Sequence, residues 1–353
     1  MPSSDENELV QEYRSCKRLY EDFAETVSDL LTKIIADKSL QLHSVTCRSK
    51  DEQSLAKKLQ RPGSVYQNLG EITDLAGVRV ITYFHDHVDF IAQMVEAEFT
   101  IDRENSTDKR ALLDPDRFGY LSLHYIVGLP PSRCSLTEYK RFKGLKAEIQ
   151  IRSLLQHVWA EVEHDLGYKS SVGVPSTIRR RFARLAGLLE LADAEFVAIR
   201  DDLSAYEEKV PQLIADTPAS VPLDQASIIA FANNSDLVHQ LDEFILSIVS
   251  SRQENPHPFL EGLIVGLNFL EIITVNDLDN ALRNHQEDIK RLTSAMLAGR
   301  RGVVVSLGIC IYYLQWAILV RKGDRGLALK WAANFPGQEK FIEGVFAACA
   351  KPG

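Results

Sequence analysis

Residues 148 to 169, EIQIRSLLQHVWAEVEHDLGYK, begin with the period of a β-strand and continue with the period of a helix. Apolar and polar residues alternate from 147 to 152, so a strand would bury one face and present Glu148 with two polar neighbours on the other. Apolar residues then recur every three or four positions, and Ser153 stands where a helix N-cap is expected. Taken alone, the stretch fits an edge strand whose polar row meets water and which runs directly into a helix.

The same alternation of strands and helices extends over the first 170 residues. Residues 1 to 40 carry a helical stripe of apolar side chains, and GVRVITYF, 77 to 84, is a strand apolar enough to be central in a sheet. A helix is expected at 87 to 98 and another strand at 120 to 129. This alternation predicts a sheet domain of the α/β or α+β class.

The second half of the chain has a different pattern. From about Ser176 onward the apolar residues keep helical spacing only. The segment 211 to 227 combines prolines with few large apolar residues, which is typical of a linker. We therefore expect a sheet domain at 1 to 210, a linker at 211 to 227 and a mainly α-helical domain at 228 to 353.

Composition places the chain among ordinary globular proteins. Its 353 residues are 45% hydrophobic and 25% charged, which leaves room for two domains. The five cysteines are scattered without a CxxC pair, so neither a disulfide framework nor a zinc site is indicated, and a cytoplasmic location is expected. The N-terminus lacks the pattern of a secretory signal. Because the formal net charge is -9, a polyanion would have to be held by local basic groups.

One uncharged stretch, residues 302 to 320, is long enough to cross a bilayer. It contains Ser306 and Gln315, has basic residues on both flanks and lies among amphipathic helices. These features favour a buried core helix over a membrane span, so contact with a membrane is the lesser alternative.

Two carboxylates are the first candidates for chemistry. The chain has no Walker-type loop and no GxGxxG after a strand, so phosphate chemistry would need a metal and cationic side chains. Asp74 stands at the entry to the strand 77 to 84, and Glu148 lies on another strand of the same expected sheet. Two such carboxylates can hold Mg²⁺ between the phosphates of a nucleotide. The run RSKDEQSLAKK, 48 to 58, supplies nearby cations, although alone it fits a solvated helix face.

Four stretches together resemble a known family. Residues 46 to 58, 74 to 80, 119 to 124 and 148 to 169 are similar, in this order, to the motifs of the RelA/SpoT synthetase domain. The resemblance covers about residues 5 to 205. It implies a nucleotidyltransferase-like fold of the α+β class, a mixed β-sheet flanked by helices, followed here by the helical domain. It also implies transfer of pyrophosphate from ATP to the 3'-hydroxyl of GTP or GDP, which makes ppGpp or pppGpp and releases AMP.

The resemblance assigns roles to the donor side of the site. Asp74 would bind Mg²⁺, and Glu148 would share that metal or take the proton of the 3'-hydroxyl. Arg48 and Arg79 match the arginines between which the family stacks adenine. Taken singly, Arg79 could instead belong to a structural ion pair. The residues that match donors to the ATP phosphates are Lys50, Ser54 and Lys57 or Lys58.

The acceptor side is assigned in the same way. Tyr120 matches the aromatic residue on which the acceptor guanine stacks, with His124 and His157 as polar neighbours. The family commonly has a basic residue after the glycine-tyrosine pair, and here Leu121 takes that place. We expect a cation from the preceding charged, loop-like segment, 102 to 119, to replace it. The candidates for that cation are Lys109, Arg110 and Arg117.

Three functions stay open at this point. The first is a monofunctional alarmone synthetase, without a hydrolase domain, whose helical domain regulates it or forms a homo-oligomer. The second is a toxin-like relative that pyrophosphorylates tRNA 3' ends or adenine nucleotides. A tRNA acceptor would need a basic surface such as Lys140, Arg141, Lys143 and Lys146 or Arg179 to Arg181. The third is a non-catalytic nucleotide sensor, against which the retained Asp74 and Glu148 argue.

Overall fold

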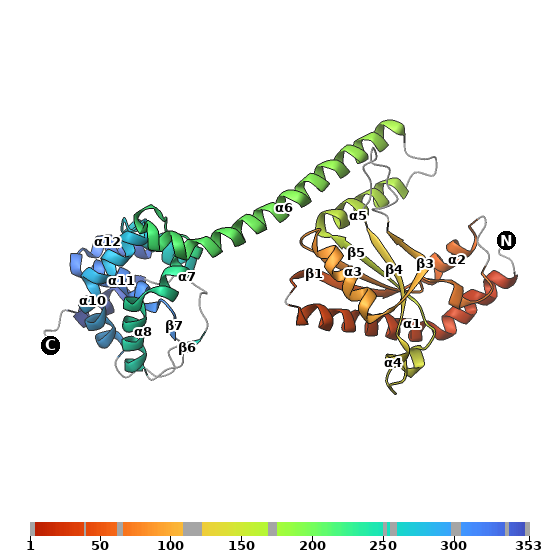
Figure 1. Ribbon diagram of the computed structural model, residues 1–353, viewed down its shortest axis with the longest axis horizontal. Coiled ribbons are helices and arrows are strands. Elements are labelled where there is room, and N and C mark those ends of the chain that lie inside the picture. The colour runs from red at the N-terminus through yellow and green to blue at the C-terminus, as the bar shows by residue number, and fades with distance from the viewer. Residues whose placement is uncertain are drawn as a thin grey trace. The chain divides into compact units, whose positions relative to one another are not determined.

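The computed structural model of the protein divides into two compact units, Met1–Arg200 and Asp201–Gly353 (Figure 1). The residues that it describes are 4–38, 40–61, 66–108, 122–168, 175–249, 253–254, 260–297, 305–335 and 339–349. Each unit has its own hydrophobic core.

The first unit is built on a five-stranded mixed sheet in the order β1-β2-β5-β4-β3. Strands β2 and β5 pair in parallel at the centre, whereas the other neighbours are antiparallel. The expected mixed sheet with flanking helices is therefore confirmed. The strands are β1 (Leu42–Ser49), β2 (Ala76–Thr82), β3 (Thr100–Asp108), β4 (Leu123–Gly128) and β5 (Ala147–Ser153).

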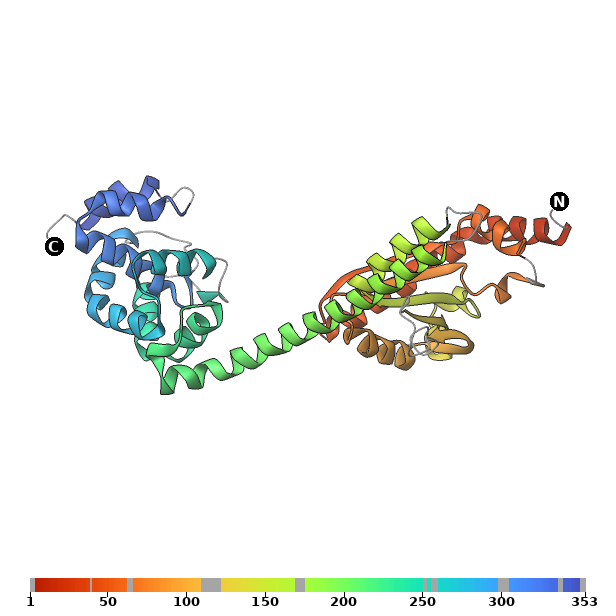
Figure 2. The same cartoon turned by 90° about the horizontal axis from the view of Figure 1, so that it is seen from above.

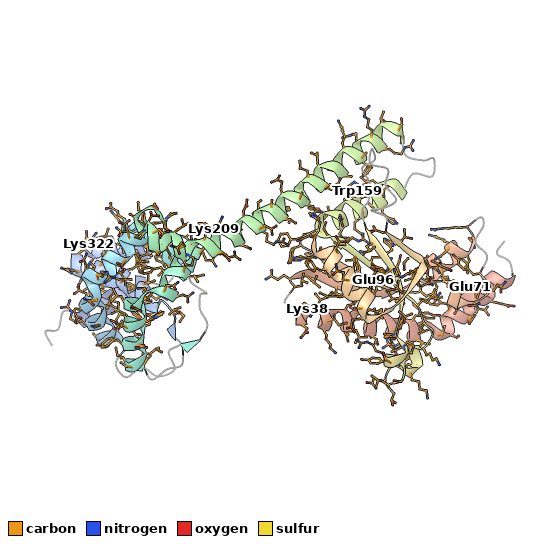
Figure 3. The ribbon with its side chains drawn as sticks, in the orientation of Figure 1. Lys38, Glu71, Glu96, Trp159, Lys209 and Lys322 are labelled. Carbon is orange, nitrogen blue, oxygen red and sulfur yellow. The ribbon has the colours of Figure 1, made fainter. Side chains whose placement is uncertain are left out.

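One face of this sheet is apolar and is covered by α1 (Ser4–Asp37) and α3 (His87–Glu98) (Figure 1). Alternate residues of the central strands, such as Val78 and Ile149, point into a core that these helices complete. Glu96 of α3 accepts a hydrogen bond of 2.7 Å from the hydroxyl of Tyr125 on β4, which ties the helix to the sheet (Figure 3). The burial of one face leaves the polar rows of the strands on the other.

The opposite, polar face is covered by α5 (Leu154–Tyr168), with the first half of α6 (Ser176–Asp216) beside it (Figures 1 and 2). The expected cap is present. The Ser153 hydroxyl accepts from the backbone N–H of Gln156 at 3.2 Å, and the backbone N–H of Ser153 donates to Oε1 of Gln156 at 2.9 Å. Trp159 of α5 donates to the carbonyl of Phe182 on α6 at 3.4 Å. The strand and the helix that the sequence predicts are thus joined without a loop.

The expectation of a loop from residue 102 onward is wrong for its first part. Residues 102 to 108 belong to β3, the edge strand, and its pairing with β4 is irregular between Asp102 and Thr107. An edge strand has one row of backbone groups in solvent, so it tolerates a polar sequence. Because the sequence of β3 is polar, its pattern did not indicate a strand. Tyr120, Leu121 and the candidate lid cations lie outside the described residues.

The remaining elements of the first unit are short. Helix α2 (Glu52–Leu59) begins after Asp51, whose carboxylate accepts from the amide of Ser54 at 3.0 Å and caps the helix. The others are η1 (Leu69–Glu71), α4 (Pro131–Cys134) and η2 (Lys140–Phe142).

The second unit is mainly helical, as expected. Its buried centre includes Trp316 and Trp331, whose rings pack edge to face with centroids 4.8 Å apart. Besides the end of α6, its elements are η3 (Pro218–Ser220), α7 (Gln225–Asn234), α8 (Asp236–Val249), β6 (Gln253–Glu254), α9 (Leu260–Phe269), α10 (Val275–Leu297), β7 (Val305–Ser306), α11 (Ile309–Lys322), α12 (Arg325–Ala332) and α13 (Glu339–Cys349).

The segment 211 to 227 does not form the separate linker that the sequence suggests. Helix α6 continues through Pro211 to Asp216, and Val221 and Leu223 are buried in the core of the second unit. Most of the segment up to Ser220 is exposed, and it joins the core through Val221, Leu223 and Ser227, which are buried. The division between the units falls after Arg200 and not after residue 210.

The uncharged segment around residue 310 forms α11, which is 14 residues long and largely buried in the second unit. Its helix begins at Ile309 because Gly308 adopts a left-handed conformation with φ of 79°. In the part of the chain that the structure describes, no helix is long and apolar enough to cross a membrane.

Candidate active site

Strand register brings the predicted donor residues together on the polar face of the sheet. On the antiparallel pair, Arg48 of β1 stands opposite Gly77 of β2, so Arg79 is its diagonal neighbour on the same face. On the parallel pair, Gly77 stands beside Glu148 of β5. These residues line a cavity of about 420 Å³, together with Lys50, Ser54, Asp74, Gln150 and His164.

Asp74, which lies just before β2, forms ion pairs with two lysines. Its Oδ2 is 2.7 Å from Nζ of Lys50, and its Oδ1 is 2.8 Å from Nζ of Lys58. Burial raises the pKa of Asp74, but the hydrogen bonds and charges of the two lysines outweigh that effect and hold the pKa below its ordinary value. The carboxylate is therefore ionised at neutral pH, and two ammonium groups are gathered where a triphosphate could replace it as their partner.

Glu148 ends a chain of hydrogen bonds. Nδ1 of His124 lies 2.7 Å from its Oε1, and Nε2 of the same imidazole lies 2.7 Å from the hydroxyl of Ser122, which is buried. Because an ionised carboxylate only accepts, Nδ1 of His124 donates to Glu148, and the Ser122 hydroxyl is the hydrogen-bond partner of Nε2. Gln150 donates to Oε2 at 3.0 Å. Both oxygens are thus held in place by donors.

The pKa of Glu148 follows from these partners. Burial raises it and so does the charge of Asp74, but the hydrogen bond and charge of His124, with the hydrogen bond from Gln150, bring the pKa below its ordinary value. The charge of Asp74 therefore acts on Glu148, and both carboxylates line the same cavity.

Helix α5 adds a third row of side chains above the sheet. Glu161 lies 3.1 Å from the guanidinium of Arg79 and 3.7 Å from Nδ1 of His157. Burial, followed by the charges of Arg152 and Arg79, lowers the pKa of His157. A second cavity of about 360 Å³ lies between α5 and the strands. The residues that line both cavities are Arg48, Arg79, Gln150 and His164. The structural ion pair of Arg79 is therefore present, but on the wall of the site.

Not every predicted residue takes part equally. Ser54 lines the first cavity, whereas Lys57 is exposed on α2 and is not among the described residues that line either cavity. Lys58 does not line either cavity itself, but it is paired with Asp74 and is therefore the better placed of the two lysines. His157 contributes to the wall through Glu161, and Tyr120 lies outside the described residues.

Ser122 and His164 are among the residues of the site that were not predicted from the sequence. Ser122 could not be recognised because its role depends on the orientation of His124. His164 carried a signal, since it follows His157 and Glu161 at the spacing of one helix face. That spacing marks a polar stripe along one face of α5, and Glu161 and His164 of this stripe line the second cavity.

Comparison with known proteins agrees with this arrangement. The model of the region found in RelA / SpoT proteins matches residues 47–172. GTP pyrophosphokinase YjbM of Bacillus subtilis is 30% identical over 162 residues, which are 45% of this chain and 72% of that protein. The chain belongs to the RelA/SpoT family.

Further relatives match a similar share of the chain. GTP pyrophosphokinase YwaC of Bacillus subtilis is 28% identical over 159 residues, which are 44% of this chain and 72% of that protein. The crystal structure of the small alarmone synthetase 1 from Bacillus subtilis covers 55% of this chain and 99% of its own, at 26% identity and a TM-score of 0.46.

Proposed function

We propose that the protein is a GTP pyrophosphokinase, which transfers pyrophosphate from ATP to the 3'-hydroxyl of GTP or GDP and releases AMP. The observation that carries the proposal is the cavity that two carboxylates, two arginines and Lys50 line, with Lys58 paired to one of the carboxylates. A chain of the RelA/SpoT family that is 30% identical to a GTP pyrophosphokinase supports the same activity.

The donor nucleotide fits the row of cations. Diagonal neighbours on antiparallel strands are about 7–8 Å apart, and a planar ring in van der Waals contact at about 3.5 Å on each side fills such a gap. Arg48 and Arg79 are such neighbours, so their guanidinium groups can sandwich adenine. Lys50 and Lys58 would then exchange their ion pairs with Asp74 for ion pairs with the phosphates. Ser54 would be a further hydrogen-bond donor to the phosphates.

The carboxylate pair fits a magnesium ion. No group of three or more metal-binding side chains occurs in the described segments, but Mg²⁺ commonly takes only one or two carboxylates and fills its shell with phosphate and water oxygens. Asp74 and Glu148 would hold it, and when bound it neutralises the charge that develops on the transferred phosphates.

Glu148 is the residue that we assign to proton transfer. The 3'-oxygen of the acceptor forms its bond to the β-phosphorus of ATP, the bond from that phosphorus to the α,β-bridging oxygen breaks, and the hydroxyl proton goes to Glu148. The hydrogen bonds from His124 and Gln150 orient the carboxylate for this step. The acceptor guanine would stack on Tyr120, as the sequence predicts.

A tRNA acceptor is not favoured. Two of the four cations of the proposed basic surface are already paired, Arg141 with Asp22 at 2.8 Å and Lys146 with Asp102 at 2.7 Å. Self-association and a cytoplasmic location stay predictions.

The test follows the transferred group. Purified protein is incubated with Mg²⁺ and ATP labelled in its β-phosphate, with GTP, GDP, ADP or tRNA as acceptor. We expect label in GTP and GDP and stoichiometric AMP. Label in tRNA or ADP instead would replace this function with the toxin-like one, and absence of any transfer would favour a nucleotide sensor.

A further inference from the structure

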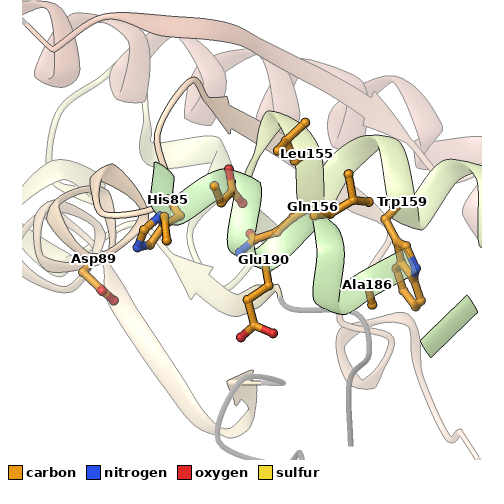
Figure 4. A pocket seen from close by; sticks show the side chains of 10 residues that line it. His85, Asp89, Leu155, Gln156, Trp159, Ala186 and Glu190 are labelled. Carbon is orange, nitrogen blue, oxygen red and sulfur yellow. The ribbon is translucent and has the colours of Figure 1, made fainter. Parts of the chain in front are cut away.

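A third cavity in the first unit, of about 340 Å³, shares no described lining residue with the two cavities of the active site. It lies between α5 and α6, next to the segment that joins β2 to α3 (Figure 4). His85 and Asp89 approach from one end, Trp159 and Ala186 from the other (Figure 4). The proposed transfer reaction uses none of these side chains.

Two buried polar atoms of the lining have no hydrogen-bond partner in the part of the chain that the structure describes. Asp193 is 4% exposed, and its Oδ2 accepts from the hydroxyl of Ser153 at 2.5 Å, but its Oδ1 has no partner among the described residues. The same holds for Nδ1 of His85. Leaving such groups unsatisfied is unfavourable, so both are suited to a molecule that enters the cavity.

The charge and the walls of the cavity define that molecule. Its described lining contains three carboxylates, Asp89, Glu190 and Asp193, and neither lysine nor arginine. Burial raises the pKa of Asp193, and the positive charge of a bound cation would lower that pKa again. The indole of Trp159 and the side chain of Leu189 supply an aromatic and apolar wall.

We propose that this cavity binds a small organic cation with a primary ammonium group and a short apolar body. The ammonium donates to Oδ1 of Asp193 and to Nδ1 of His85 in its neutral form, and the body packs on Trp159 and Leu189. A metal ion is disfavoured because no metal-binding group of three or more residues occurs in the described part of the chain.

Calorimetric titration of the full-length protein tests the site, with butylamine as probe and 1-butanol as its neutral counterpart at constant ionic strength. We expect butylamine to bind with a Kd of about 1 mM or below, and 1-butanol at least about tenfold more weakly. Asp193→Asn keeps the shape and removes the charge, so butylamine affinity should fall about tenfold or more.

Two exposed glutamates of α6 provide a matched pair that leaves the fold intact. Glu190 lines the cavity and Glu195 does not. Glu190→Gln should weaken butylamine binding several-fold, whereas Glu195→Gln should not, and this pair decides the matter if Asp193→Asn fails to fold. Equal binding of 1-butanol, equal affinity in the two glutamine variants, or no binding up to about 10 mM butylamine would overturn the proposal.

Discussion

Glu148 shows how one side chain acquires a role from its partners. On an isolated strand it would be a solvated acid, but here His124 and Gln150 hold both its oxygens and Asp74 lies near enough to oppose its charge. Ser122 in turn holds the far nitrogen of the imidazole. The carboxylate is thereby fixed in orientation and kept ionised, as a group that accepts a proton in a defined direction must be.

Arg79 should be irreplaceable by lysine. Arg79→Lys keeps the charge but removes the planar group on which adenine would stack, so we expect the KM for ATP to rise about tenfold with a smaller effect on the KM for GTP. Steady-state kinetics with each substrate varied will measure this. Arg18→Lys on the exposed face of α1 serves as control, and an unchanged KM for ATP in Arg79→Lys would contradict the stacking role.

His157 should make stability depend on pH. Its pKa in the folded protein lies below the ordinary value of about 6.5, so as the pH falls below 6.5 the unfolded chain binds a proton that the folded chain does not. Stability is therefore complete above that pH and decreases in the acidic direction. Urea unfolding at pH 7 and pH 5 should show that the free energy of unfolding falls more between these two pH values in the wild type than in His157→Gln. Equal losses would refute the shift.

At the scale of elements, the junction of β5 and α5 positions the site. Ser153 ends the strand, caps the helix and donates to Asp193 of α6, so a single hydroxyl connects three elements. This junction holds the polar face of α5, with Glu161, above Arg79. The direction of the helix across the sheet follows from where the strand ends.

Ser153→Ala should therefore cost more than a simple cap. Loss of an N-cap costs about 1 kcal/mol, and leaving the carboxylate of Asp193 without its donor adds about 1–3 kcal/mol. We expect the free energy of unfolding of the first unit to fall by about 2 kcal/mol or more in urea, and Ser153→Thr to retain most of it. A change below about 0.5 kcal/mol in Ser153→Ala would show that the junction does not depend on this hydroxyl.

The central strands and helices could be predicted from their hydrophobic periodicity and from the propensities of their residues. The other elements could not, because their sequences depend on where they lie in the fold. The alternation of apolar and polar residues from 147 to 152 predicts β5, because one face of this strand is fully buried. Strand β3 was missed because an edge strand can be polar on both faces. Asp74, Glu148 and the cations were recognisable as residue types in motif order, whereas the link from Ser122 through His124 to Glu148 depends on a register that no local pattern encodes.

At the scale of the whole molecule, the separate cores should unfold separately. Gly266 on α9 lies against the buried side chains of Gln315 and Trp331, which are joined by a hydrogen bond of 3.0 Å. A methyl group there would overlap with the amide oxygen of Gln315, so Gly266→Ala should destabilise the second unit by about 1–3 kcal/mol. Gly344→Ala on α13 faces open space and should not destabilise the unit, since alanine favours a helix more than glycine does.

Differential scanning calorimetry will show whether the two units respond independently. In Gly266→Ala we expect the transition of the second unit to move to lower temperature while that of the first unit stays in place. A concerted shift of both transitions would mean that the units unfold as one.

The decisive measurement is the rate at which 3'-pyrophosphorylated guanosine nucleotide forms from ATP and GDP in Glu148→Gln, with Glu138→Gln, at an exposed position between α4 and η2, as matched control. Because glutamine keeps the shape of the side chain but cannot take the proton, Glu148→Gln should lose at least about 100-fold in kcat with its fold intact by circular dichroism. Glu138→Gln should remain close to the wild type. A Glu148→Gln protein with wild-type kcat would contradict the assignment of proton transfer to this carboxylate.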